Sequence, residues 1–135
     1  SASLLRENFI HWIMVDIPAS AGSIDEGACS DGIVPGGKDN PTGPQGSRQG
    51  INDYTSFFAG DDDMGGNYCG YDGPCPPWND EIAHHYHFQL LAIDLKRCQI
   101  DPGFTAEEVL ATIEGHVTEG TEIIGTYSLN PNVKA

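Results

Sequence analysis

The chain has 135 residues, with 20 Asp and Glu against 6 Lys and Arg, and a formal net charge of −14 when the histidines are neutral. This charge argues against nucleic acid and anionic membranes as partners, because both attract clustered cations. No apolar run approaches the roughly 20 residues that cross a bilayer, so we expect no membrane span. The length predicts a single domain, residues 1–135, with one core.

The composition favours an all-β fold. The chain combines 17 Gly and 9 Pro with only 19% charged residues, which is typical of short strands and many turns. The four cysteines, Cys29, Cys69, Cys75 and Cys98, follow no metal-binding spacing and allow three disulfide pairings. A disulfide would indicate a periplasmic or secreted protein, with the cytoplasm as the alternative. No signal peptide is recognisable at Ser1.

The first predicted element is a strand over residues 9–17, which are almost continuously apolar or β-branched and stop at Pro18. By the two-residue period of strands, Phe9 and His11 share one face, and Trp12 and Met14 share the other. Both faces are mostly apolar, so we expect a central, covered strand. Such a strand needs neighbours on both sides, and only eight residues precede it, so the sheet is expected to lack a partner.

Residues 19–80 are predicted to form a long, largely irregular excursion, because Gly, Pro, Asn, Asp and Ser dominate there. Loops of this length in compact domains are usually functional or disordered. The acidic run at residues 61–63 could bind calcium, but it lacks the alternating oxygen ligands and distal Glu of an EF-hand loop. A solvated acidic turn is the preferred interpretation.

Regular structure is predicted to resume with a second long strand over residues 83–94. His84, Tyr86, Phe88, Leu90 and Ala92 would lie on one face, and His85, His87, Gln89, Leu91 and Ile93 on the other. The spacing of Thr105 and Glu108 is that of a capping box and predicts a helix to about residue 115 or 116. Residues 122–129 predict a final strand.

The histidines are the first candidates for a functional site. His85 and His87 point the same way on the predicted strand and could ligate zinc with a third ligand from His11, His116 or a cysteine. The sequence places no such ligand, so a surface or hydrogen-bonded pair is the simpler interpretation. We predict neither a metal site nor a cofactor.

His11 and His84 each lie near the start of an apolar strand, at the rim of an apolar face. Apolar walls with a few polar groups are typical of ligand pockets. The segment before His84 contains Pro74, Pro76 and Pro77, and would form a stiff loop with few backbone donors. A preformed cavity and a pair of hydrogen-bonded core histidines both remain compatible with this pattern.

Four separated motifs, in this order, resemble the phosphatidylethanolamine-binding protein family, also called Raf-kinase-inhibitor-like proteins. The last two are similar to its bacterial branch in particular. The motifs are His11-Trp-Ile-Met-Val-Asp-Ile-Pro-Ala19; Gly73-Pro-Cys-Pro-Pro77 followed by His84-His-Tyr-His-Phe88; Glu114-Gly-His-Val117; and Ile124-Gly-Thr-Tyr-Ser128.

The resemblance implies an antiparallel β-sandwich with short peripheral helices and a small pocket that accepts an anion. The ligand would be a small molecule bearing a phosphate or carboxylate group, and the binding could serve a regulatory role. Two alternatives stay open: an enzyme using the histidine pair and a carboxylate from another segment as acid and base, and a protease or kinase inhibitor. No catalytic residue is assigned. The implied ligand-binding residues are Phe9, His11, Gly73, Pro74, Pro76, His84, Tyr86 and Tyr127.

The sequence departs from the family in three ways. The N-terminal portion of the family, whose carboxylate lines the same pocket, is not found before Ser1. We therefore expect a second polypeptide that supplies these strands, or a homodimer. The segment from Phe57 to Cys69 is longer than usual, and His85 stands where the family commonly has arginine, which weakens charge support near the site.

Overall fold

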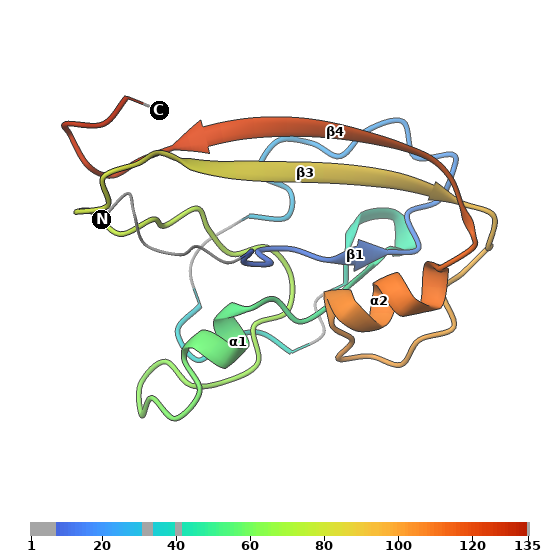
Figure 1. The fold of residues 1–135 in the computed structure, drawn as a ribbon. Helices are drawn as coiled ribbons and strands as arrows, with labels where there is room; N and C mark the ends of the chain where they lie inside the picture. The colour runs from blue at the N-terminus through green and yellow to red at the C-terminus, as the bar shows by residue number, and fades with distance from the viewer. Residues whose placement is uncertain (1–7, 31–33, 40–41, 135) are drawn as a thin grey trace. The chain divides into compact units, whose positions relative to one another are not determined.

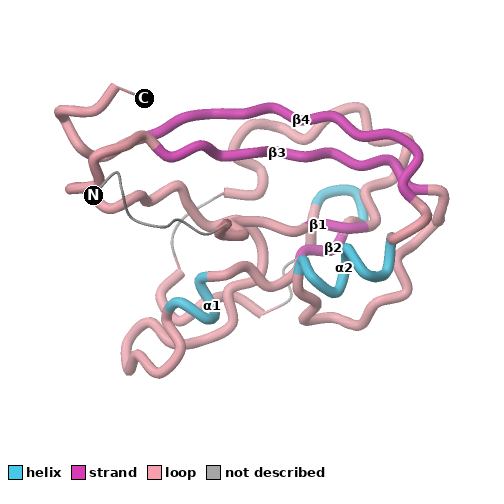
Figure 2. The backbone as a smooth tube through the Cα atoms, in the orientation of Figure 1, coloured by secondary structure: helices cyan, strands magenta, loops and turns pink. Residues whose placement is uncertain are grey.

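The computed structural model describes residues 8–30, 34–39 and 42–134. The strands are β1 (Met14–Val15), β2 (Arg48–Gln49), β3 (His84–Ile93) and β4 (Val117–Tyr127), and the α-helices are α1 (Tyr54–Phe57) and α2 (Ala106–Ile113), with a short 3-10 turn at Pro44–Gly46. The strands form two antiparallel sheets, β1–β2 and β3–β4, as Figure 2 shows. The predicted all-β fold is confirmed in its coarser form, as a mainly-β fold with two short α-helices, and the predicted β-sandwich stays a prediction.

The chain divides into two compact units that alternate along the sequence. The ribbon unit contains Asn8, Gly73–Asp94 and the described residues from His116 onward, and the core unit contains the described parts of Phe9–Asp72 together with Leu95–Gly115. The single domain expected from the length therefore stays a prediction.

The ribbon unit is built on the pairing of β3 with β4, the two longest arrows in Figure 1. The register runs from His84 opposite Tyr127 to Ile93 opposite Val117, with a shift between Ala92 and Ile93. The second predicted strand is confirmed almost to the residue. The last strand begins at residue 117, not 122, because Val117 and the four residues that follow it lie beside the end of β3 in the ladder. Their sequence carries no apolar alternation, so only the partner strand defines them as a strand.

The predicted central strand over residues 9–17 is wrong. Only β1 within it is a strand, paired on one side with β2. Carbonyls two residues apart in a regular strand point the same way. Here the carbonyl of Ile13 accepts from the N–H of Gly50 at 2.9 Å, and that of His11 accepts from the N–H of Asp72 at 3.2 Å. The backbone groups of this segment are thus satisfied by separate loop residues, which excludes a regular ladder.

Asp16 anchors the end of this segment. Its backbone has a φ of 60°, a left-handed conformation that Asp tolerates better than most residues. Its carboxylate is 2% exposed and accepts hydrogen bonds from Arg48 Nε at 2.7 Å and from the backbone N–H of Cys98 at 2.8 Å. It also forms an ion pair with Arg97 at 3.2 Å. Arg48 also donates to two carbonyls of the segment that contains Cys98, at 2.8 Å each. One buried carboxylate therefore joins three separate parts of the core unit.

Apart from Pro76, the buried apolar residues of the described chain lie in the core unit. They are Val15, Tyr68, Cys69, Cys98, Phe104, Val109 and Ile113. Gly50 packs against Phe104 so closely that an added Cβ would lie 2.4 Å from its ring, so only glycine fits there. The predicted capping box is confirmed, since the Thr105 hydroxyl accepts from the N–H of Glu108 at 3.3 Å and α2 follows at once. The helix ends at Ile113, slightly before the predicted boundary.

All four cysteines are free thiols in the structure, two of them buried, so no disulfide supports the periplasmic or secreted location, which stays a prediction. Burial raises the pKa of the Cys98 thiol, and the nearby carboxylate of Asp16 raises it further. Both effects keep this thiol protonated and unreactive. Within the described residues, neither helix has the length and apolar character needed to cross a membrane.

Candidate functional site

Three predicted site residues gather at one end of the ribbon unit. His84 lies directly opposite Tyr127 in the ladder, and Tyr86 follows two residues later on the same face. The His84 and Tyr86 rings are stacked, with centroids 6.5 Å apart and an interplanar angle of 30°. We call His84, Tyr86 and Tyr127 the His84 cluster. All three are at least partly exposed to solvent, so the cluster offers to a ligand one imidazole, which stacks on the phenol ring of Tyr86.

Asp80 fixes the orientation of the His84 ring. Its Oδ2 lies 2.6 Å from His84 Nε2, and its side chain is 8% exposed against 29% for the imidazole. An ionised carboxylate only accepts hydrogen bonds, so Nε2 carries the hydrogen. The sequence reasoning missed Asp80. The sequence did contain a signal for Asp80, because this acidic residue follows the stiff proline segment and precedes His84 by four residues.

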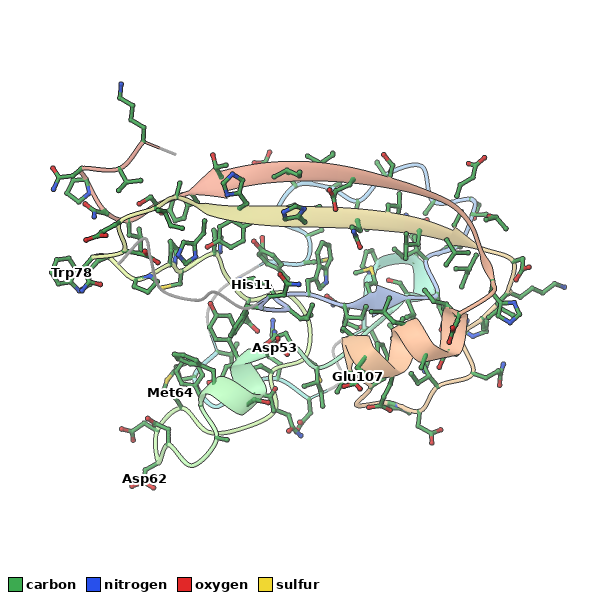
Figure 3. The ribbon with its side chains drawn as sticks, in the orientation of Figure 1. His11, Asp53, Asp62, Met64, Trp78 and Glu107 are labelled. Atoms are coloured by element: carbon green, nitrogen blue, oxygen red, sulfur yellow. The ribbon has the colours of Figure 1, made fainter. Side chains whose placement is uncertain are left out.

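The loop that leads to Asp80 contains the remaining predicted residues of this unit. Gly73 and Pro74, joined by a cis peptide bond, are exposed, whereas Pro76 is buried. Trp78, labelled in Figure 3, belongs to the same loop and is 74% exposed. The loop therefore presents both a buried proline and exposed apolar surface. Its role as a pocket wall stays a prediction.

The other two predicted site residues meet in the core unit. The rings of Phe9 and His11 have centroids 4.8 Å apart, and Tyr54 of α1 packs edge-on against both, at 4.8 Å from Phe9 and 5.6 Å from His11. We call Phe9, His11 and Tyr54 the His11 cluster. The sequence reasoning did not identify Tyr54, because its approach depends on the irregular path of residues 50–54 beside residues 10–13.

His11 is fixed by a backbone acceptor. Its Nδ1 lies 2.7 Å from the carbonyl oxygen of Asp72, and since a carbonyl cannot donate, Nδ1 carries the hydrogen. Asp72 is itself held, because its carboxylate accepts from Nδ2 of Asn52 at 2.8 Å. Asn52 is 1% exposed and also donates to the carbonyl of Gly70 at 3.0 Å. A buried amide therefore supports the residue that orients His11.

The two clusters lie in different units of the chain. The structure brings Phe9 together with His11, and His84 together with Tyr86 and Tyr127. The predicted convergence of the two imidazoles is a relation between the units, so it stays a prediction.

Neither alternative cation site has a ligand set. His87 Nδ1 lies 3.2 Å from an oxygen of Glu122 across the ribbon, on the face opposite His84. Across the described part of the chain, no three His, Cys, Asp or Glu side chains are grouped to hold a metal ion. The carboxylate of Asp61 accepts from the N–H groups of Met64 and Asp63, which lowers its pKa. Figure 3 shows Asp62 at the tip of this loop, so it is an exposed acidic turn.

Comparison with known proteins places the chain in a family. The sequence model described as phosphatidylethanolamine-binding protein matches residues 2–128. A UPF0098 protein of Methanothermobacter thermautotrophicus is 32% identical over 87% of this chain and 61% of its own length. A UPF0098 protein of Pyrococcus abyssi is 34% identical over 88% of the chain and 54% of its length, and one of Aquifex aeolicus is 29% identical over 88% and 56%.

This chain therefore spans little more than half the length of these relatives. The matches cover the ordered series of motifs from His11 to Ser128 that first suggested the relationship. The chain belongs to the phosphatidylethanolamine-binding protein family.

Proposed function

We propose that this chain is a small-ligand binding protein that accepts a phosphate or carboxylate group, with His11 and His84 as its candidate ligand-binding residues. The observation that carries the proposal is that each imidazole has one nitrogen committed to a protein acceptor, at 2.7 Å and 2.6 Å. Each ring is thus oriented before any ligand arrives, which lowers the entropic cost of binding. Aromatic side chains flank both rings.

The chemistry of the rings explains how an acidic protein accepts an anion. In a neutral imidazole with one nitrogen donating, the other nitrogen carries a lone pair. A hydrogen bond between this nitrogen and the acid group of the ligand requires one proton, because both groups are otherwise acceptors. The proton can reside on the nitrogen or on the acid group. A protonated ring donates a charge-assisted hydrogen bond, which is stronger than a neutral one. A local, partly dry site therefore binds an anion in spite of the net charge of −14.

The groups that orient the two imidazoles are close in the sequence. Asp72, which accepts the hydrogen of His11, directly precedes Gly73 in the sequence. Gly73 opens the proline loop that ends at Asp80, the partner of His84. The residue that orients one histidine and the residue that orients the other thus begin and end one short segment, whose Gly73, Pro74 and Pro76 are the proposed wall.

The proposal extends to the fold. In the proposed β-sandwich the whole chain forms one domain. β3 and β4 belong to a larger sheet, and further strands pack on a face of this sheet. The ribbon has the surface for such a cover, because Phe88 is 44%, Leu90 58%, Ile123 73% and Ile124 51% exposed. The covering strands would come from a second polypeptide or a second copy of the chain. Sedimentation of the 14.5 kDa chain as a stable monomer with the ribbon fully folded would contradict this.

The ligand site is tested by NMR titration of the full chain with inorganic phosphate and, separately, with acetate. We expect saturable shifts of the His11 and His84 ring signals with the same dissociation constant, because one ligand contacts both. His11→Ala and His84→Ala should each weaken binding about tenfold, the size of one charge-assisted hydrogen bond. His116→Ala is the control, since His116 pairs with Asp94 beyond the far end of β3.

Two outcomes would overturn the proposal. If both substitutions at His11 and His84 leave the affinity unchanged, the site is elsewhere. If the two rings shift with different dissociation constants, the clusters are separate sites and the shared pocket is wrong.

A further inference from the structure

We propose that Asp80 is a positioning residue of the ligand site: its carboxylate keeps the hydrogen of His84 on Nε2 and so makes Nδ1 the nitrogen that contacts the acid group of the ligand. This inference rests on the function proposed above and adds a residue to it. Asp80 lies outside the motifs by which the family was identified, and its role follows from the contacts of this chain.

The geometry of the pair is that of an anchored ring. The distance of 2.6 Å between Asp80 Oδ2 and His84 Nε2 is short even for a hydrogen bond to a charged group. The carboxylate is the more buried partner, at 8% exposure against 29% for the imidazole. Among the described residues, Nδ1 of His84 makes no hydrogen bond. The ring therefore has one nitrogen bound to a buried acceptor and one available to a ligand.

Asp80 is itself held from two sides. Its N–H donates to the carbonyl of Pro77 at 3.1 Å, and its carbonyl accepts from Nδ2 of Asn130 at 3.0 Å. The N–H of Asn130 donates to the Ser128 hydroxyl at 3.1 Å. Ser128 directly follows Tyr127 of the His84 cluster. The end of β4 thus carries one member of the cluster and also fixes the residue that orients another.

The physical gain is preorganisation. An imidazole without a fixed acceptor rotates and exchanges its hydrogen between the two nitrogens, so a ligand must select one arrangement from several. A buried carboxylate removes this choice. The same logic applies to metal-binding histidines, whose second nitrogen is commonly fixed by a carboxylate or carbonyl. Asp80 would fix the orientation of the His84 ring in an anion site, as such partners fix the orientation of histidines in a metal site.

The chain contains a matched control. His116 Nδ1 lies 2.7 Å from Asp94 Oδ1, the same chemical pair in the same unit, but both side chains are exposed, at 42% and 55%. Asp94 directly follows β3, whereas Asp80 precedes it. Removing this second carboxylate changes a histidine partner without touching the His84 cluster.

The test compares Asp80→Ala, Asp80→Asn and Asp94→Ala in the full chain. The ¹⁵N chemical shifts of the rings, recorded at an alkaline pH where imidazoles are neutral, report which nitrogen carries the hydrogen. Titration with inorganic phosphate near neutral pH then reports the affinity. Amide spectra of the β3–β4 ladder report whether each variant is folded.

We expect the hydrogen of His84 on Nε2 in the wild type. Asp80→Ala should mix the two tautomers and weaken phosphate binding about tenfold, the size of one hydrogen bond to a charged group. Asp80→Asn should keep the tautomer, because its amide oxygen still accepts, and should retain most of the affinity. Asp94→Ala should alter His116 alone.

The inference is overturned if the wild-type hydrogen lies on Nδ1, a result that needs no variant, or if Asp80→Ala folds and binds phosphate as the wild type does. If phosphate leaves the wild-type His84 signals unchanged, the proposed function fails. The tautomer measurements then still decide whether Asp80 orients the ring, so the two failures are distinguishable.

Discussion

The two units of the chain combine regularity and burial in opposite ways. The ribbon unit has the longest strands, β3 and β4, yet many of its apolar side chains are exposed. The core unit has two-residue strands, yet apart from Pro76 it contains the buried apolar side chains of the described residues. Regular hydrogen bonding and burial are thus separate properties. A strand becomes regular when a partner of equal length runs beside it, and a segment becomes buried when loops and side chains close over it.

The two histidines show the same contrast. His84 lies in a regular ladder, and a side-chain carboxylate orients it. His11 lies in irregular backbone, and a main-chain carbonyl orients it. The carboxylate that orients His84 can be removed by a single substitution. The main-chain carbonyl that orients His11 cannot, and it can be displaced only by changing the residues that hold it in place. Substitutions should therefore act directly in the ribbon unit and through supporting contacts in the core unit.

The largest effect is expected where the core unit depends on a single charge. Asp16→Ala should lower the free energy of unfolding by about 3 kcal/mol, because it leaves the cations of Arg48 and Arg97 and the N–H of Cys98 without their buried acceptor. Urea unfolding followed by fluorescence measures the change. Asp62→Ala, on the exposed loop tip, should shift the value by no more than about 0.5 kcal/mol. Equal stabilities for the two variants would show that Asp16 does not join the core unit.

An intermediate effect is expected at the residue that supports His11. Asn52→Ala should cost about 2 kcal/mol, because it removes a buried amide and leaves the Gly70 carbonyl without this donor. It should also weaken the phosphate response of His11, since Asp72 loses a contact. Asn67→Ala is the matched control, as this exposed amide makes one long contact of 3.4 Å. If Asn52→Ala lowers the stability but leaves the phosphate response of His11 unchanged, Asn52 stabilises the core unit and does not position His11.

The smallest effect is expected on the exposed face of the ribbon. Hydrogen bonds from Gln89 and His87 lower the pKa of Glu122 below its usual value of 4.5. A carboxyl group with a lowered pKa stabilises the fold above its unfolded-state pKa, and this contribution disappears as the pH falls through the folded-state pKa. Glu122→Gln should therefore unfold slightly earlier than the wild type at pH 7 and equally at about pH 3.

Urea midpoints recorded at several pH values measure this difference. Glu119→Gln, on the same strand, is the control, because it removes a carboxylate of β4 and leaves the contacts of Glu122 with Gln89 and His87 in place. A constant difference for Glu122→Gln at every pH would mean that its charge is irrelevant.

The parts of the fold that depend on neighbours in sequence were predictable. Thr105 and Glu108 are three residues apart and cap α2 by themselves. The alternation from His84 to Ile93 is visible because each residue of a strand takes the opposite face from the one before. The segment around His11 was not predictable, since its partners Gly50, Asp53 and Asp72 come from irregular loops that leave no periodic signal.

The residues of the candidate site also differ in whether the sequence could predict them. The family resemblance supplied the eight predicted ligand-binding residues, and the structure groups five of them into the His84 and His11 clusters. Asp80 could have been found, because it precedes His84 by four residues in a stiff segment. Tyr54 could not, because only the path of the folded backbone brings it to Phe9. Pairing across a long sequence separation is a property of the whole chain and leaves no trace in a local window.

The interleaving of the two units has a consequence for biosynthesis. The chain passes between them at Asn8–Phe9, at Asp72–Gly73, at Asp94–Leu95 and at Gly115–His116, so β3 is translated before α2 and β4 after it. On a ribosome, β3 must wait with both edges unpaired until the helical segment has emerged and β4 follows. During that interval its apolar face is a surface for chaperones or for aggregation. No single cut in the chain would separate the two units, so truncation cannot produce either unit alone. The order in which the units fold can instead be followed with nascent chains of increasing length.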